Sequence, residues 1–79
     1  MATIKTRDLD KHLKKILPEG SKEKARIYAK GVLEGESRNQ ELNEDQIVRA
    51  CRMMRDDVSD PVDSFNAKKI CDGLMEMLE

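Results

Sequence analysis

The sequence is poor in aromatic residues and in long hydrophobic runs. Tryptophan is absent, and Tyr28 and Phe65 are the only aromatic side chains. Proteins that bind single strands of nucleic acid by stacking need several exposed aromatics, so this mode of binding is disfavoured. The longest apolar run is three residues, too short for a transmembrane helix or for the core of a secretory signal. We therefore expect no membrane association and a cytoplasmic location.

Residues that usually carry chemistry are also few. Cys51 and Cys71 lie twenty residues apart without a paired-cysteine motif, and His12 is the only histidine. Zinc and copper sites usually join ligands that are close in sequence, and a catalytic nucleophile needs a nearby, oriented base. No phosphate loop of the form GxxxxGK or GxGxxG occurs. We therefore expect no enzymatic activity, metal, cofactor or small-molecule substrate, and free buried thiols rather than a disulfide.

Apolar residues make up 38% of the chain and charged residues 39%, which is typical of neither a disordered nor a membrane protein. Four segments carry apolar residues at the spacing of an amphipathic helix. The predicted helices span about 6–17, 21–34, 44–57 and 61–78. Apolar residues cover more than half the circumference of the last one, which predicts that this helix is the most central. The sequence therefore predicts an all-α fold, a compact bundle of four short helices forming one domain over 1–79.

Local signals mark where two of these helices begin. Asn43 and Gln46 have the spacing of a capping box, in which each side chain bonds the backbone amide of the other residue. Asp60 suits the cap position before Pro61, whose ring is pre-set for the first helical turn. Residues 35–42 are almost entirely polar and predict a flexible loop, and we find no strand-like alternation of useful length.

The segment RACRMMRDDVSDPVDSF, residues 49–65, holds three arginines, two methionines and four aspartates. Its aspartates suggest calcium, which an EF-hand loop binds through oxygen ligands at alternate positions. In the registers that start at Asp56 or Asp57, however, Val58 or Pro61 falls on a ligand position. We therefore expect no calcium site in this segment.

The three arginines of this segment, Arg49, Arg52 and Arg55, recur every three residues. Asp45 precedes Arg49 by four residues, and Asp56 follows Arg52 by four. Residues four apart are neighbours on a helix surface, so this spacing predicts ion pairs along the helix. We therefore expect a solvated, salt-linked face.

Charge is distributed unevenly along the chain. Residues 1–30 hold nine Lys/Arg against four Asp/Glu, a balance of +5, whereas residues 31–79 hold six against twelve, a balance of −6. The two halves can attract each other within one fold or between copies, or the basic half can bind an acidic partner. Nucleic acid would use the basic block at 5–30, since Asp60 and Asp63 would repel phosphates from a helix-turn-helix at the last helix. The candidate basic patch consists of Lys11, Lys14, Lys15, Lys22, Lys24, Arg26 and Lys30.

Protein recognition is the leading hypothesis for function. Ile27, Met53 and Met75 lie off the apolar stripes of their helices, and a patch with methionines would be an adaptable docking surface. With Arg55, which is close to Met53 in sequence, they form the candidate protein interface.

We predict a small, non-enzymatic accessory or regulatory protein that binds a protein partner or a second copy of itself as a homodimer. Nucleic-acid binding through residues 5–30 is the alternative. Small helical chains of this kind are common among accessory proteins of phages and mobile elements. This is a general expectation for such proteins, and no residue of the sequence demonstrates it.

Overall fold

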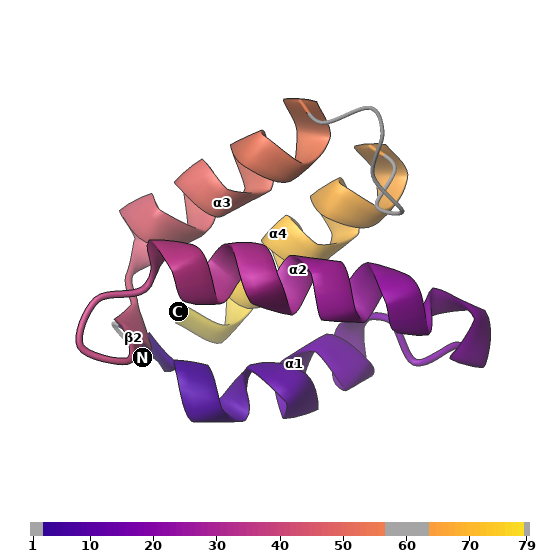
Figure 1. The fold of residues 1–79 in the computed structure, drawn as a ribbon, viewed down its shortest axis with the longest axis horizontal. Helices are drawn as coiled ribbons and strands as arrows, with labels where there is room; N and C mark the ends of the chain where they lie inside the picture. Colours follow the sequence, from indigo (N-terminus) through magenta and orange to yellow (C-terminus); the bar gives the residue numbers. More distant parts are fainter. Residues whose placement is uncertain (1–2, 57–63, 79) are drawn as a thin grey trace.

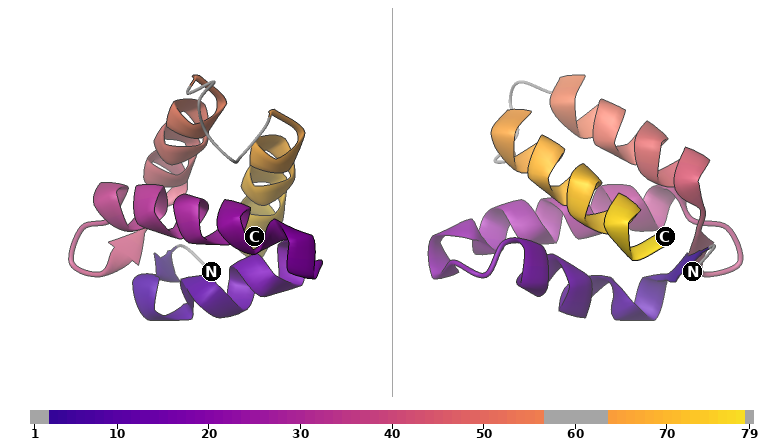
Figure 2. Two further views of the ribbon diagram at one scale, coloured as in Figure 1. Left: turned by 45° about the vertical axis from the view of Figure 1, so that its right-hand side comes forward. Right: turned by 180° about the vertical axis from the view of Figure 1, so that it is seen from behind.

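The computed structural model describes residues 3–56 and 64–78 of the chain. In these ranges the α-helices are α1 (Leu9–Ile16), α2 (Glu23–Glu36), α3 (Glu44–Asp56) and α4 (Ser64–Leu78). They pack as two pairs, α1 with α2 and α3 with α4, and the second pair lies across the first (Figures 1 and 2). The predicted all-α bundle of four helices is confirmed.

The helices form a ring in which α2 packs on α1, α3 on α2, and α4 on both α3 and α1. The sequence predicted that α4 is the most central helix. In the structure α4 packs mainly against two neighbours, α3 and α1. Burial of one large apolar side chain stabilises a fold by about 1.5–3 kcal/mol, so packing of the helical stripes holds the ring together. The buried apolar side chains are Ile4, Leu9, Leu13, Ile16, Leu17, Ala25, Ala29, Leu33, Leu42, Ile47, Ala50, Cys51, Met54, Ala67, Ile70 and Leu74.

The start of α3 has the predicted capping box. The backbone amide of Gln46 donates to Oδ1 of Asn43 at 2.9 Å, and the amide of Asn43 donates to Oε1 of Gln46 at 2.7 Å. Two amides that no helical carbonyl can reach are satisfied in this way. The box sets the first residue of α3 at Glu44, as the sequence predicts.

A pair of two-residue strands, which the sequence analysis missed, joins the N-terminal segment to the connection between α2 and α3. Strand β1 (Ile4–Lys5) pairs antiparallel with β2 (Glu41–Leu42), with Ile4 opposite Leu42. Both of these apolar side chains are buried, so the pair closes one end of the core. Strands of two residues are too short for an alternating pattern to appear in the sequence.

The turn before β2 accounts for much of the segment that was predicted to be a loop. Asn39 and Gln40 have φ values of 52° and 60°, in the left-handed region, and Arg38 and Glu41 exchange two backbone hydrogen bonds of 3.0 Å. Positive φ at both central residues is the geometry of a tight hairpin turn. The segment 35–42 therefore contains the end of α2, this turn and β2, and its flexibility stays a prediction.

The remaining boundaries differ from the sequence prediction by a few residues. Short 3-10 helices at Thr6–Asp8 and Gly20–Lys22 precede α1 and α2, so regular α-helix begins later than expected. Helix α2 continues to Glu36, two residues beyond the predicted end. The start predicted for the last helix at Asp60, Pro61 and Asp63 lies outside the described residues.

Candidate protein interface

Helix α3 exposes a large apolar side chain beside arginines. Met53 is 49% exposed, although Met54 next to it is completely buried. Residues four apart share a helix face, so Met53 projects from the same side of α3 as Arg49. Arg49 reaches toward α2, where its Nη1 lies 3.9 Å from Oε2 of Glu36. Met53 therefore lies on the α2 side of the exposed surface of α3.

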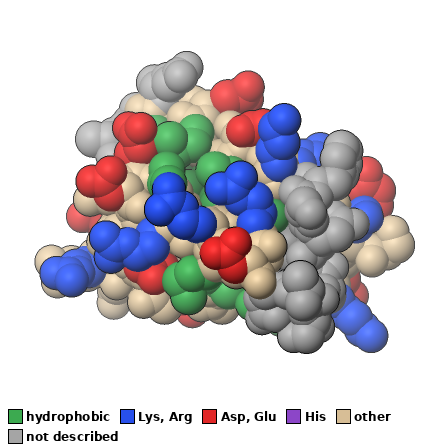
Figure 3. All heavy atoms as spheres, turned by 90° about the horizontal axis from the view of Figure 1, so that it is seen from above, with side chains coloured by type: hydrophobic (Ala, Val, Ile, Leu, Met, Phe, Trp, Pro, Cys, Tyr) green, Lys and Arg blue, Asp and Glu red, His purple; other side chains and the backbone are tan. Residues whose placement is uncertain are grey.

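The arginines of α3 do not have the partners that the sequence predicted. The expected ion pair of Asp45 with Arg49 is wrong, because Arg49 approaches Glu36 instead. The expected pair of Asp56 with Arg52 is not among the ion pairs of the described residues. Within the described residues, Arg52 and Arg55 form no ion pair. We call Arg49, Arg52, Met53 and Arg55 the α3 face. Figure 3, which views the molecule from above Figure 1, shows hydrophobic side chains on this side of the molecule with both Lys or Arg and Asp or Glu side chains around them.

The structure does not gather the candidate interface residues into one patch. Ile27 is 64% exposed, but it lines a groove between α1 and α2 together with Lys14 and Glu23. Met75 is half-buried against the core on α4, one turn after Cys71 and on the same face. The α3 face thus holds Met53 and Arg55, while Ile27 and Met75 lie on other parts of the surface.

The candidate basic patch is divided among several surfaces. Arg26 donates from Nη1 to the backbone carbonyls of Leu17 and, at 2.8 Å, of Glu19, where it ties down the connection between α1 and α2. Lys30 lies 3.0 Å from Oδ2 of Asp10, and this hydrogen bond raises the pKa of Lys30. These two cations are therefore engaged in holding α1 to α2.

The other members of the patch face different directions. Lys14 lies in the groove between α1 and α2, whereas Lys15 lines a cleft between α1 and α4. Lys22 is half-buried, and Lys11 and Lys24 are exposed. Whether any of them binds nucleic acid stays a prediction.

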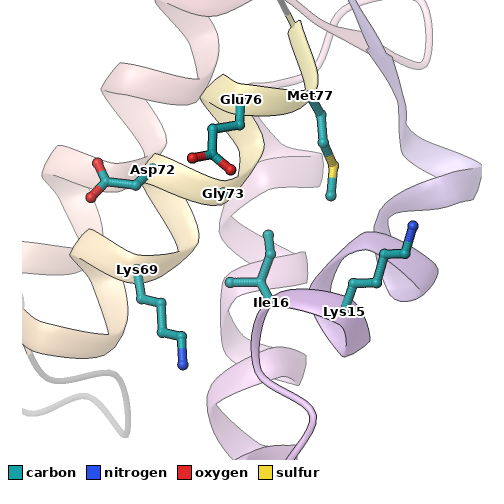
Figure 4. Close-up of a pocket in the computed structure, with 7 residues that line it drawn as sticks. All are labelled: Lys15, Ile16, Lys69, Asp72, Gly73, Glu76 and Met77. Carbon is teal, nitrogen blue, oxygen red and sulfur yellow. The ribbon is translucent and has the colours of Figure 1, made fainter.

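The cleft between α1 and α4 has a volume of about 540 Å³ (Figure 4). Its walls carry charges of both signs, from Lys15 and Lys69 and from Asp72 and Glu76. At its base Ile16 of α1 approaches α4 so closely that a Cβ on Gly73 would lie 2.6 Å from Cγ1 of Ile16. Sequence reasoning missed this cleft because no local pattern indicates which faces of α1 and α4 meet.

The two cysteines lie on helices that pack against each other, Cys51 on α3 and Cys71 on α4. Both are free thiols, and Cys51 is buried whereas Cys71 is half-buried. Burial raises the pKa of Cys51 well above its ordinary value. Within residues 3–56 and 64–78, no three side chains of His, Cys, Asp or Glu are grouped so that they could hold a metal ion.

Comparison of the chain with protein-family models, with curated proteins and with solved structures found no match. Among the helices of the described residues, none has both the length and the apolar character that crossing a membrane requires.

Proposed function

We propose that this chain is a small, non-enzymatic accessory or regulatory protein of the cytoplasm that binds an acidic protein segment through the α3 face. The observation that carries the proposal is Met53, which is half-exposed one turn after Arg49, on a helix that also carries Arg52 and Arg55, neither of which has an ion-pair partner within the described residues. Methionine and arginine are both enriched at protein interfaces, where charged residues in general are depleted. A flexible methionine adapts to an apolar side chain, and arginine guanidinium groups pair with carboxylates in two-pronged hydrogen bonds.

Charge complementarity supports an acidic partner. Glu44 and Asp45 lie in the first turn of α3, Arg49 and Arg52 lie in its middle, and Arg55 and Asp56 lie together in its last turn. A partner segment with carboxylates on both sides of one apolar residue would match this arrangement. The homodimer version of the prediction has less support, because Ile27 and Met75 lie apart from Met53.

Nucleic-acid binding through residues 5–30 has less support than protein binding. Arg26 and Lys30 are bound to acceptors within the fold, and Lys14 and Lys15 lie in different grooves, one beside α2 and the other beside α4. A phosphate backbone would therefore meet a mixed surface. The observations favour the α3 face.

The proposal is tested with displayed peptide libraries. One library holds acidic peptides with a central Leu, the second has Ser in place of Leu, and the third has Lys in place of the acidic residues. We expect the wild-type chain to enrich the first library alone, the variant Met53→Asp to lose this enrichment, and Ile27→Asp to keep it. Ile27→Asp is a matched control because it removes another large exposed apolar side chain, from a different surface.

Two other outcomes contradict the proposal. Enrichment of the Lys library would show that acidic residues of the chain form the interface. Equal loss of binding in Met53→Asp and Ile27→Asp would show that the interface is elsewhere or that both variants disturb the fold. Sedimentation over a range of concentrations tests whether the wild-type chain forms a dimer. If it does, and if Met53→Asp dissociates the dimer, then a second copy of the chain and not an acidic segment binds the α3 face, which contradicts the proposal.

A further inference from the structure

The methionines of the described residues differ sharply in their exposure to solvent. Met53 is 49% exposed, whereas Met54, the next residue of α3, is 0% exposed. Met75 and Met77 on α4 are half-buried and pack against the core. Successive residues of a helix project in different directions, so α3 directs one methionine toward solvent and its neighbour into the core. Within residues 3–56 and 64–78, Met53 is therefore the methionine that a small molecule in solution reaches most easily.

We propose that Met53 is a modification site, at which a peroxide oxidises the thioether to a sulfoxide and thereby weakens binding of the acidic segment to the α3 face. The sulfur of Met53 attacks one oxygen of hydrogen peroxide, an S–O bond forms and the O–O bond breaks. The oxygen that leaves takes the proton of the attacked oxygen and becomes water. The sulfur loses two electrons and the peroxide gains two. The effect on binding rests on the proposed function, whereas the site of oxidation does not.

Oxidation of Met53 leaves the core of the fold unchanged, because this side chain is not part of it. Met54 does belong to the core, and a sulfoxide there would place a polar oxygen among apolar side chains, which is costly. Burial shields the sulfur of Met54 from peroxide. The arrangement of the two residues on α3 thus directs oxidation to the methionine that contacts the partner and away from the one that holds the helices together.

The sulfoxide alters the property of Met53 on which the α3 face depends. A thioether is apolar and flexible, so it adapts to an apolar side chain of the partner. A sulfoxide oxygen accepts hydrogen bonds, and contact with an apolar side chain removes the water that supplies them. We expect this loss to raise Kd for an acidic peptide with a central Leu about tenfold. The arginines of the face are unchanged, so a weaker attraction that salt screens should remain.

The site of oxidation is tested on the full wild-type chain in its folded form. The chain is treated with hydrogen peroxide for increasing times, and each methionine is followed by mass spectrometry of its peptide. We expect sulfoxide at Met53 first, at Met75 and Met77 later, and at Met54 last. While Met53 is the only one of these four that is oxidised, the melting temperature should be unchanged. Oxidation of Met54 or Met75 as fast as Met53 would overturn the assignment.

The effect on binding is measured by titration with the same acidic peptide before and after this treatment. Met53→Leu is the matched control, because it keeps an apolar side chain of similar size but has no sulfur to oxidise. Peroxide should raise Kd of the wild-type chain about tenfold and leave that of the variant unchanged. Both proteins keep Cys51 and Cys71, so the comparison separates oxidation of Met53 from oxidation of the thiols. Methionine sulfoxide reductases for both epimers, with dithiothreitol, should restore wild-type binding, whereas dithiothreitol alone should not.

Two results of the titration overturn the proposal. Equal loss of binding by the wild-type chain and by Met53→Leu would assign the effect to another residue. Unchanged binding by a wild-type chain with Met53 fully oxidised would show that the thioether does not contact the partner. If the untreated wild-type chain does not bind the peptide, the proposed function and the effect on binding both fail, while the order of oxidation still decides whether Met53 is the modification site.

Discussion

Two large apolar side chains are exposed to solvent on helices that carry basic residues: Ile27 on α2 is 64% exposed, and Met53 on α3 is 49% exposed. The basic residues around them differ in what they bind. Next to Ile27, Arg26 donates to backbone carbonyls, and one turn away Lys30 pairs with Asp10. Next to Met53, Arg52 has no ion pair among the described residues. The same kinds of side chain therefore stabilise the fold in one region and are available to a partner in the other.

This difference shows why a count of basic residues along the chain is a poor guide to a binding surface. The N-terminal half has the larger positive balance, but part of its charge is used where α1 meets α2. The shorter run of arginines on α3 has fewer internal partners and lies on the helix that exposes Met53. The following predictions test this division of roles, beginning with the largest expected effect.

Reversal of one charge on the α3 face should weaken binding of an acidic peptide far more than reversal of a charge on α2. We expect Arg52→Glu to cost about 2 kcal/mol, or about 30-fold in Kd, because a paired guanidinium is replaced by a carboxylate that repels the partner. Lys24→Glu, also at an exposed position, should change Kd by about twofold or less. Isothermal titration of both variants with the same peptide measures the ratio, and equal losses would remove the distinction between the two regions.

Loss of an α2 cation should instead destabilise the fold. Arg26→Ala leaves the carbonyls of Leu17 and Glu19 without their side-chain donor, which we expect to cost about 1–2 kcal/mol of unfolding free energy. Arg52→Ala removes no such bond and should change stability by about 0.5 kcal/mol or less. Urea unfolding followed by circular dichroism measures both values. If Arg52→Ala is the more damaging change, the arginines of α3 have a structural role.

The glycines provide a test of packing between the two helix pairs. Gly73→Ala places a Cβ against Ile16, and overpacking of this kind costs about 1–3 kcal/mol, of which the better helix propensity of Ala returns about 1 kcal/mol. Gly31→Ala meets no atom within 4 Å at an exposed position of α2, so it should stabilise the fold by about 0.5–1 kcal/mol. Opposite shifts in melting temperature are expected, and equal gains would show that α1 does not approach α4 at Gly73.

The smallest expected effect is the pH dependence of the pair between Lys30 and Asp10. Because the hydrogen bond with Asp10 raises the pKa of Lys30 above its ordinary value of 10.5, the pair stabilises the folded state below that value. This contribution is lost as the pH rises through the raised pKa. The urea midpoint of wild-type protein should exceed that of Asp10→Asn slightly at neutral pH, and the difference should vanish in strongly alkaline solution. A difference that grows with pH would contradict the assignment.

The parts of the fold that depend on neighbouring residues were predictable from the sequence. The capping box of Asn43 and Gln46 involves side chains three residues apart, and the helical stripes repeat within each helix. By contrast, the salt bridge from Arg49 to Glu36 depends on how α2 crosses α3, so local spacing wrongly assigned Arg49 to Asp45.

The candidate site was only partly predictable for the same reason. Helical spacing placed Met53 off the apolar stripe of its helix, and the structure shows that it is exposed. The same spacing carried no information on whether Ile27, Met53 and Met75 share a surface, because each lies on a different helix. Strands β1 and β2 escaped detection because two residues show no period.

The most direct measurement of the central claim is the change in backbone amide chemical shifts of the isotope-labelled chain when an acidic peptide with a central Leu is added. The account predicts that the largest changes, weakened by added salt, fall on Arg49, Arg52, Met53 and Arg55 and that α1 and the first turns of α2 change little. Changes concentrated at Lys11, Lys14 and Lys24, with α3 unaffected, would contradict it.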